Sequence, residues 1–264
     1  MLLKQEGPFK QGLNMIAELN GNHSEMMMDF GILKLNKNDK YHDDFDLERV
    51  IMLIYGHIKV QWQDKEIEVK RDDYLEDDVW AINLPGKVPV DIVGLGDDTE
   101  MCVIRTDNDK SFDVHIFNQQ NTIKEIRGKG FMNEADTRIC RTMMDTKLSP
   151  HSNIVLGEDV HFPGRWSGYP NHYHPQPEIY FYKFHPENGY GLLKLGDEAV
   201  VLDHNCTVLI HPNKVHPQCT CPGYAMYYIW AIRNLPGNPY VSPIVDPAYA
   251  WCEQEGARYW PDDK

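Results

Sequence analysis

The sequence predicts an all-β protein that contains two β units in tandem. Short runs of β-branched and aromatic residues recur along the chain, and each run is bounded by Gly, Asn, Asp or Pro. These runs outnumber the segments that have a helical period. Each half of the 264 residues holds about seven of them, which is enough to fill a small sandwich or barrel with few free edges.

The first unit is predicted to span residues 1–121. Tyr55-Gly56-His57 and Gln63-Asp64-Lys65 have the composition of hairpin turns and separate neighbouring runs. The histidines of this unit show no H-x-H pair and no Glu at a suitable spacing, so we expect a metal-free barrel used for packing and assembly. These histidines are His23, His42, His57 and His115. The predicted strands are residues 28–35, 50–55, 57–62, 66–69, 79–84, 88–93 and 100–106.

The second unit, residues 151–264, is predicted to follow a connector at 122–150. The connector is rich in charge, contains Gly128-Lys129-Gly130 and shows no clear period of two or 3.6. In the tail, residues 246–251 can begin a short helix with Pro247 in its first turn. The predicted strands are residues 153–160, 174–182, 191–195, 199–202, 206–210, 216–219 and 224–232.

The composition of the chain indicates which kinds of partner and which cellular compartment to expect. The chain has 26 Lys and Arg against 40 Asp and Glu, which gives a net charge of −14 at pH 7 and argues against nucleic acid. No apolar stretch reaches the roughly 20 residues of a membrane span, and the start, MLLKQEGPFKQGLN, lacks the apolar core of a signal peptide. We therefore expect a cytoplasmic protein without a membrane partner.

The six cysteines are too few for a dense disulfide framework, and Cys219-Thr220-Cys221 lacks the second pair of a zinc knuckle.

One histidine-rich segment points to a metal site. His172 and His174 are two residues apart, so on a strand their side chains project from the same face. The insert Pro175-Gln176-Pro177 can turn the chain into the next strand, from which Glu178 faces back toward both imidazoles. Two imidazole nitrogens and one carboxylate oxygen suit a divalent first-row metal ion and leave positions open for substrate.

A fourth ligand is predicted downstream. His216 follows an apolar run and a proline turn, and an antiparallel pair of strands can return it beside the first ligands. His211 is the rival for this position, but it precedes Pro212 on the outgoing strand. The predicted metal ligands are thus His172, His174, Glu178 and His216, and ligand type alone does not choose among zinc, iron and manganese.

Other side chains lie an even number of residues from these ligands, so on a strand they project from the same face. Tyr180 and Tyr182 have the parity of Glu178, so each is predicted either to line the cavity, where a phenol can relay a proton, or to pack in an aromatic core. Together with Glu178 they are the candidate catalytic residues. Gln218 has the parity of His216 and is the candidate substrate-binding residue. Histidines without a partner pattern are predicted on the surface or in loops: His151, His161, His185 and His204.

The two motifs resemble those of a known superfamily. The pattern H-x-H-x3-E followed by P-x3-H is similar to the metal-binding motifs of the cupins, which are small β-barrels with the metal inside. More narrowly, residues 122–251 resemble the 5-deoxy-glucuronate isomerase family, although that family has an acidic residue and a longer insert where this chain has Pro175-Gln176-Pro177. Residues 178–182 and 229–232 are also similar to its sister family, 5-keto-4-deoxyuronate isomerase. The segments that carry the main resemblance are residues 138–141, 166–174, 178–180, 208–212, 216–217, 222–224, 227–228 and 246–251.

The resemblance implies two tandem cupin-like β-barrels, a bicupin, and an intramolecular aldose-ketose isomerase. The implied reaction converts 5-deoxy-D-glucuronate to 2-deoxy-5-keto-D-gluconate in inositol catabolism. The alternatives are the 5-keto-4-deoxyuronate isomerase of pectin breakdown, a cupin dioxygenase and a non-catalytic sugar-binding cupin. The implied cofactor is a divalent metal ion, zinc first, with iron, manganese or nickel as alternatives.

A sugar acid as the small-molecule partner brings a carboxylate that an Arg or a Lys is expected to bind. Candidates near the motifs are Arg165, Lys183, Lys214 and Arg233. We also expect a homo-oligomer, because exposed barrel edges favour self-association.

Overall fold

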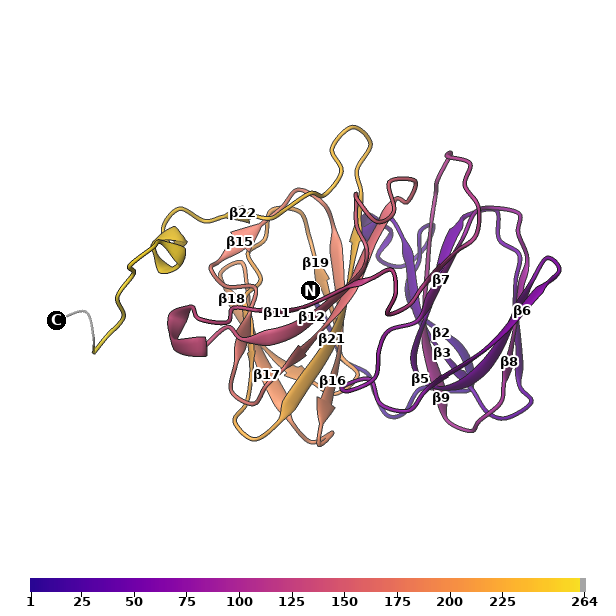
Figure 1. Cartoon of the computed structure of the whole chain (residues 1–264), viewed down its shortest axis with the longest axis horizontal. Helices are drawn as coiled ribbons and strands as arrows, with labels where there is room; N and C mark the ends of the chain where they lie inside the picture. Colours follow the sequence, from indigo (N-terminus) through magenta and orange to yellow (C-terminus); the bar gives the residue numbers. More distant parts are fainter. Residues whose placement is uncertain (262–264) are drawn as a thin grey trace.

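The computed structural model describes residues 1–261 and consists almost entirely of β-strands, as the sequence predicts. Two β units lie side by side along the longest axis, and the C-terminal segment extends beyond the second unit (Figure 1). The helical elements in these residues are single 3-10 turns, and none of them is long or apolar enough to cross a membrane. They are η1 (Ser24–Met26), η2 (Met132–Glu134) and η3 (Ala250–Glu253).

The first unit is a nine-stranded antiparallel sheet that curls on itself. Its main path has the order β10-β7-β5-β9-β3-β2, while β6 and β8 both pair with β5, and β4 pairs with β8. The strands are β2 (Gly12–Ala17), β3 (Asp29–Leu35), β4 (Lys40–Asp43), β5 (Glu48–Trp62), β6 (Lys65–Arg71), β7 (Ala81–Leu84), β8 (Val90–Gly94), β9 (Thr99–Thr106) and β10 (His115–Phe117).

The turn predicted at Tyr55-Gly56-His57 is wrong, because β5 continues through it as one strand of 15 residues. Before Gly56 the strand pairs with β7 and β9, and from Gly56 onward it pairs with β6 and β8. Gly56 has a φ of +116°, and the register with β9 shifts just before it. The glycine therefore bends one strand from one set of partners to another. The turn after Trp62 is confirmed, since Trp62 pairs with Lys65.

We expect Gly56→Ala to lower the free energy of unfolding by about 2–4 kcal/mol, from backbone strain and overpacking together. A Cβ at this position lies 2.7 Å from Cβ of Thr99, and the positive φ disfavours any side chain. Gly223→Ala is the matched control, because Gly223 also has a positive φ but has open space around it. Urea denaturation of both variants separates the two effects. Equal losses of about 1 kcal/mol would show that the contact with Thr99 contributes nothing.

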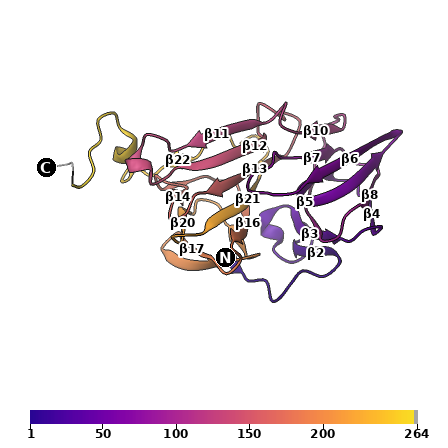
Figure 2. The ribbon, with the colours of Figure 1, turned by 60° about the horizontal axis from the view of Figure 1, so that its bottom comes forward.

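The second unit combines three sheets (Figure 2). The largest has the order β1-β19-β16-β21-β13-β12-β11, a smaller one has the order β14-β20-β17-β18, and β15 pairs with β22. The strands are β1 (Leu2–Leu3), β11 (Ile123–Arg127), β12 (Arg138–Met144), β13 (Ile154–His161), β14 (Trp166–Ser167), β15 (His172–Tyr173), β16 (Glu178–His185), β17 (Tyr190–Leu195), β18 (Glu198–Asp203), β19 (Thr207–Ile210), β20 (Gln218–Thr220), β21 (Ala225–Arg233) and β22 (Ile244–Val245).

Four segments of this unit differ from the prediction. Residues 122–150 were expected to be a connector without regular structure, yet they contain β11 and β12, which pair into the large sheet. The strand expected from residue 174 begins at Glu178, because Pro175 and Pro177 have no N–H to donate to a neighbouring strand. The strand expected from residue 216 begins at Gln218. In the tail, the helical turn lies at 250–253 instead of starting at 246.

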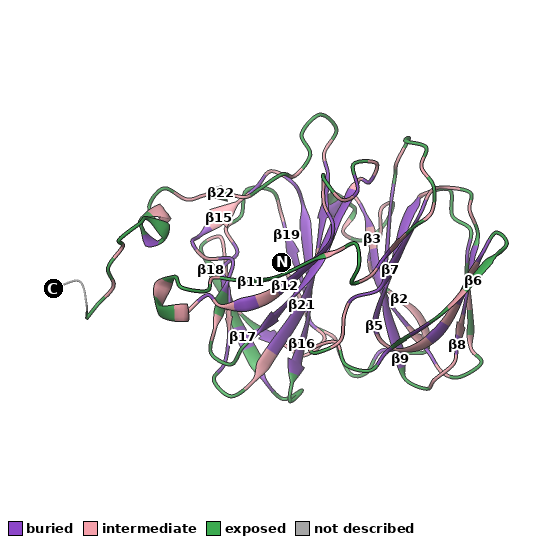
Figure 3. Cartoon of the chain, in the orientation of Figure 1, coloured by how far each residue is buried: buried purple, intermediate pink, exposed green. Residues whose placement is uncertain are grey.

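Apolar side chains form one core inside each unit and a third core between the two units. Buried residues lie on the strands of both units (Figure 3). Alternation along β16 divides its side chains between two of these cores. Ile179 and Phe181 belong to the core between the units, whereas Tyr180 and Tyr182 point into the second unit. The parity argument for the two tyrosines is therefore confirmed, and Glu178 begins the inward-facing row.

Candidate metal centre

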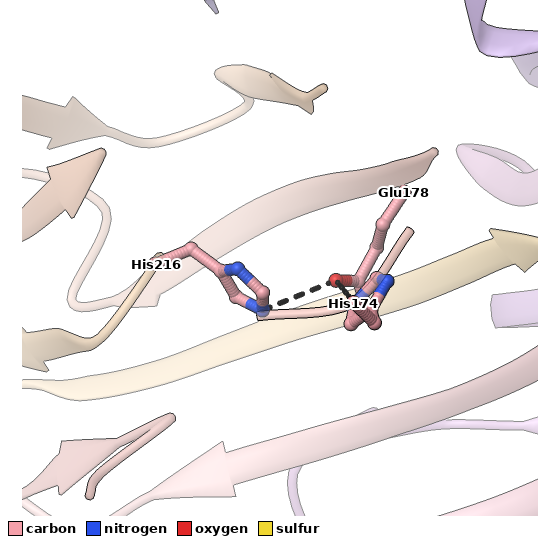
Figure 4. A group of neighbouring side chains, drawn as sticks. All are labelled: His174, Glu178 and His216. Atoms are coloured by element: carbon pink, nitrogen blue, oxygen red, sulfur yellow. Dashed lines mark hydrogen bonds and ion pairs between the residues drawn. The ribbon is translucent and has the colours of Figure 1, made fainter. Parts of the chain in front are cut away.

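Three of the predicted ligands meet inside the second unit. Ligand atoms of His174, Glu178 and His216 all lie within 4.8 Å of one another (Figure 4). Oε2 of Glu178 is 3.1 Å from Nε2 of His174 and 3.3 Å from Nε2 of His216. All three side chains are buried. The two motifs, far apart in sequence, thus supply a compact group of nitrogen and oxygen atoms.

Short backbone contacts bring the two motifs together. Glu178 begins β16 and pairs with Ile210 of β19 and Ile232 of β21. His174 precedes it in the proline turn, and the carbonyl oxygen of His174 accepts a hydrogen bond from the backbone N–H of Asn213 at 2.8 Å. This bond joins the proline turn to the loop that leads from β19 to His216.

The hydrogen bonds of the imidazoles identify which nitrogen is free. The Nδ1 atoms of His174 and His216 lie 3.0 Å and 2.8 Å from the carbonyl oxygens of Gln176 and Lys214. A carbonyl oxygen only accepts, so each Nδ1 carries the proton and each Nε2 presents a lone pair. Nε2 of His216 is buried and has no hydrogen-bond partner in the part of the chain that the structure describes. Two lone pairs beside a carboxylate fit a divalent cation, and carbonyl-oriented imidazoles are usual around metal ions.

His172 lies beside this group but outside it. Its ring contacts the ring of His216 edge-on with 5.0 Å between centroids, and its Nδ1 is 3.1 Å from the carbonyl oxygen of Pro170. Strand parity does not relate His172 to His174, because β15 ends at Tyr173 and pairs with β22. Burial and the neighbouring His216 lower the pKa of His172 to about 3. Burial also lowers the pKa of His216, so both imidazoles are neutral at pH 7, as metal binding requires.

The remaining predicted residues occupy three different positions. Tyr180 lines the cavity beside the group, and its ring lies 5.6 Å from that of His216. Tyr182 donates a hydrogen bond from its hydroxyl to the side-chain oxygen of Gln218, and both residues are fully buried and are not among the described residues that line the cavity. Burial raises the pKa of both tyrosines. His211 is partly exposed and lies 3.4 Å from Glu25, away from the metal group.

A cavity of about 380 Å³ adjoins His172, Glu178 and Tyr180. The far wall comes from strands of the large sheet and from the C-terminal segment, which passes over the cavity as β22 pairs with β15. Polar residues of that wall are Arg127, Asp136, Arg138, Asp159 and Tyr228. The four basic residues suggested by the sequence do not line this cavity within residues 1–261.

The wall residues form a connected network. Asp159 accepts hydrogen bonds from Nε of Arg138 at 2.7 Å, from the Tyr228 hydroxyl at 3.1 Å and from Nε1 of Trp230 at 3.0 Å. Nη1 of Arg138 also contacts Oδ2 of Asp136 at 2.6 Å. Arg138 falls within a segment that carries the resemblance. No sequence pattern predicts that Asp136 and Asp159 line the cavity, because only the register of β12, β13 and β21 brings them there.

The prediction that His161 lies on the surface or in a loop is wrong. His161 is fully buried on β13, which continues one residue past the predicted strand and turns its odd-numbered side chains inward. Neither ring nitrogen has a hydrogen-bond partner among residues 1–261, and burial lowers the pKa of His161 to about 3. His185 is exposed, while His151 and His204 lie in turns and are partly buried.

The sequence model of the KduI/IolB family matches residues 1–252. The chain belongs to the KduI/IolB family. Relatives named 5-deoxy-glucuronate isomerase are 22% identical: that of Geobacillus thermodenitrificans over 80% of this chain and 85% of its own length, and that of Bacillus velezensis over 90% and 96%. The family and these names indicate that this KduI/IolB member is an isomerase.

Solved structures show the fold of this KduI/IolB member to be cupin-like. An IolB-like protein from Salmonella typhimurium LT2 superposes with a TM-score of 0.85 at 19% identity, covering 96% of this chain and 99% of that one. An oxalate decarboxylase from Lactobacillus farciminis superposes with a TM-score of 0.64 at 11% identity, covering 90% and 85%.

Proposed function

We propose that the protein is a metal-dependent aldose-ketose isomerase that converts 5-deoxy-D-glucuronate to 2-deoxy-5-keto-D-gluconate in inositol catabolism. The observation that carries the proposal is the group of His174, Glu178 and His216 at one end of a cavity, with imidazole lone pairs directed at a carboxylate. The names of the relatives supply the substrate.

We assign the metal to His174, Glu178 and His216, with His172 as the fourth ligand because its ring contacts that of His216. Zinc is the first candidate, with iron, manganese and nickel as alternatives for the same donor set. A divalent ion held there supplies Lewis-acid stabilisation of negative charge on the substrate oxygens.

The cavity walls provide polar groups for the rest of a sugar acid. Arg127 lines the cavity with one carboxylate partner, Glu125 at 2.6 Å, whereas Arg138 is shared between Asp136 and Asp159. We therefore assign the substrate carboxylate to Arg127. The Tyr180 hydroxyl is the candidate hydrogen-bond donor to a substrate oxygen. Tyr182 and Gln218 bond to each other, and the Tyr182 ring lies edge-on to that of Tyr180 with 6.1 Å between centroids, so we assign them the role of supporting Tyr180.

We also propose that each β unit is a cupin-like barrel, so that the chain is a tandem bicupin. Support comes from the likeness to oxalate decarboxylase over 90% of this chain, which spans both units. A homo-oligomer is part of the proposal, because β11 ends the large sheet and all five of its residues are exposed.

The substrate is tested by incubating separate zinc, iron, manganese and nickel forms with 5-deoxy-D-glucuronate and following the product by NMR. We expect conversion by at least one metal form and none by the metal-free protein. If the protein converted 5-keto-4-deoxyuronate but not 5-deoxy-D-glucuronate, the assigned substrate would be wrong and the protein would be assigned the reaction of the sister family. Oxygen consumption by the iron form without isomerisation would overturn the reaction class.

A further inference from the structure

Isomerisation through an enediolate needs a group that takes a proton from one carbon and returns it to the next, and the carboxylates at the cavity differ in their freedom to do so. Glu178 belongs to the metal group. Both oxygens of Asp159 are occupied, because they accept three hydrogen bonds from Arg138, Tyr228 and Trp230. Glu253 lies on the exposed C-terminal segment.

Asp136 is different because one of its oxygens is free. It lines the cavity just before β12, and its side chain is only 6% exposed. Oδ2 contacts Nη1 of Arg138, which also donates to the Asp136 carbonyl oxygen at 3.0 Å, so the carboxyl is fixed in place. Oδ1 is buried and has no hydrogen-bond partner in the described chain. A buried carboxylate oxygen without a partner is costly and calls for a functional explanation.

We propose that Asp136 is the catalytic carboxyl that moves the proton between the two reacting carbons. This inference rests on the proposed isomerase function. Oδ1 of Asp136 removes the proton from C2 of the aldose, and the electrons of that C–H bond form a C1=C2 double bond while the carbonyl oxygen gains the negative charge. The same carboxyl returns the proton to C1. The proton of the C2 hydroxyl passes to the C1 oxygen, so a C2 ketone and a C1 alcohol result without any oxidant.

The surroundings of Asp136 suit both directions of transfer. Burial raises the pKa of its carboxyl to about 7, Arg138 on β12 opposes the rise, and Asp159 on β13 and Glu253 on η3 add to it. Arg127 on β11 and Glu178 on β16 are the other charged groups that line this cavity. Proton removal needs the ionised form, so kcat is expected to rise with pH through about 7.

The test is Asp136→Asn in the metal-loaded protein, because an amide oxygen can still accept from Arg138 but cannot take a proton. We expect kcat to fall by about 10²–10⁴-fold with KM and metal content unchanged, and the exchange of the C2 hydrogen with deuterated water to fall equally. Asp136→Glu should restore part of both. Asp197→Asn, in the exposed turn between β17 and β18, is the control and should match the wild type.

Two further outcomes separate this inference from the proposed function. If the wild type converts the substrate and Asp136→Asn retains kcat and hydrogen exchange, the role of Asp136 is overturned. If the wild type does not convert the substrate, the proposed function fails, and Asp136 is then judged by infrared difference spectra. A carboxylic acid band that titrates near pH 7 and is missing in Asp136→Asn supports an acid-base group, and its absence from the wild type overturns it.

Discussion

Replacing His174 with alanine is expected to remove the bound metal and to lower kcat by at least about 10³-fold. That factor corresponds to roughly 4 kcal/mol of transition-state stabilisation, at 1.36 kcal/mol for each tenfold change, which is a reasonable share for a Lewis acid. The variant loses one Nε2 lone pair and leaves Glu178 facing His216 alone. Metal content by mass spectrometry and turnover by NMR check the two parts separately.

His211→Ala is the matched control for this experiment. His211 lies on the same loop as His216, is partly exposed and is directed to Glu25 instead of the metal group. It should retain both metal and activity. If His174→Ala kept its metal and its turnover while folding normally by circular dichroism, the assignment of the metal centre to these side chains would be wrong.

Sequence spacing predicts the inward-facing row that begins with Glu178 because the geometry of that row is local. Glu178, Tyr180 and Tyr182 alternate along one strand, and period two places them on one face. Spacing is less informative where prolines interrupt the strand. His172 lies on β15 and His174 lies in the proline turn that follows, so their shared parity does not place them in the same group of ligand atoms.

The far wall of the cavity depends on contacts that spacing does not show. Asp159 reaches Arg138 and Tyr228 because β13 pairs with β12 on one side and β21 on the other. Residues 122–150 have no clear alternation, yet β11 and β12 extend the large sheet through backbone hydrogen bonds, which do not depend on the side chain of any residue other than proline. At Gly56 the composition predicts a turn, but the structure has a bend within one continuous strand.

The net charge of the chain and the charges at the cavity have different effects on an anionic ligand. The chain carries −14 overall, which opposes the approach of an anionic sugar acid. At the cavity, Arg127 and Arg138 lie among four carboxylates, those of Asp136, Asp159, Glu178 and Glu253, and protonation of Asp136 below its pKa of about 7 removes one of these negative charges. For the proposed anionic substrate, we therefore expect binding to depend on these groups and on the bound metal ion more than on the net charge of the chain.

The largest expected loss of stability comes from Glu158→Ala. Glu158 is fully buried and accepts hydrogen bonds from Arg71 at 2.6 Å, from Arg141 at 2.7 Å and from the Tyr227 hydroxyl at 2.7 Å. Arg71 lies on β6 of the first unit, whereas Glu158 lies on β13 of the second, so the carboxylate joins the two units. Removing it leaves two buried guanidinium groups without their counter-ion. We expect a loss of about 3–5 kcal/mol in the free energy of unfolding.

Guanidinium chloride denaturation measures the loss, with Glu66→Ala as the control, because Glu66 is exposed and forms only surface pairs. A loss below about 1 kcal/mol, the range of a surface pair, would contradict the role assigned to Glu158.

A triple variant, Arg71→Met with Arg141→Met and Glu158→Leu, distinguishes the cost of an unpaired charge from the value of the network itself. Apolar replacement of a whole buried ionic group is often neutral or stabilising. In this protein, however, both arginines also donate to backbone carbonyl groups of the loop after β6, at Tyr74, Leu75 and Asp77. The triple variant leaves those carbonyl groups without donors. We therefore expect the triple variant to be more stable than Glu158→Ala but less stable than the wild type. The difference in free energy of unfolding between the wild type and the triple variant then measures how much the two arginines contribute by holding that loop against the second unit.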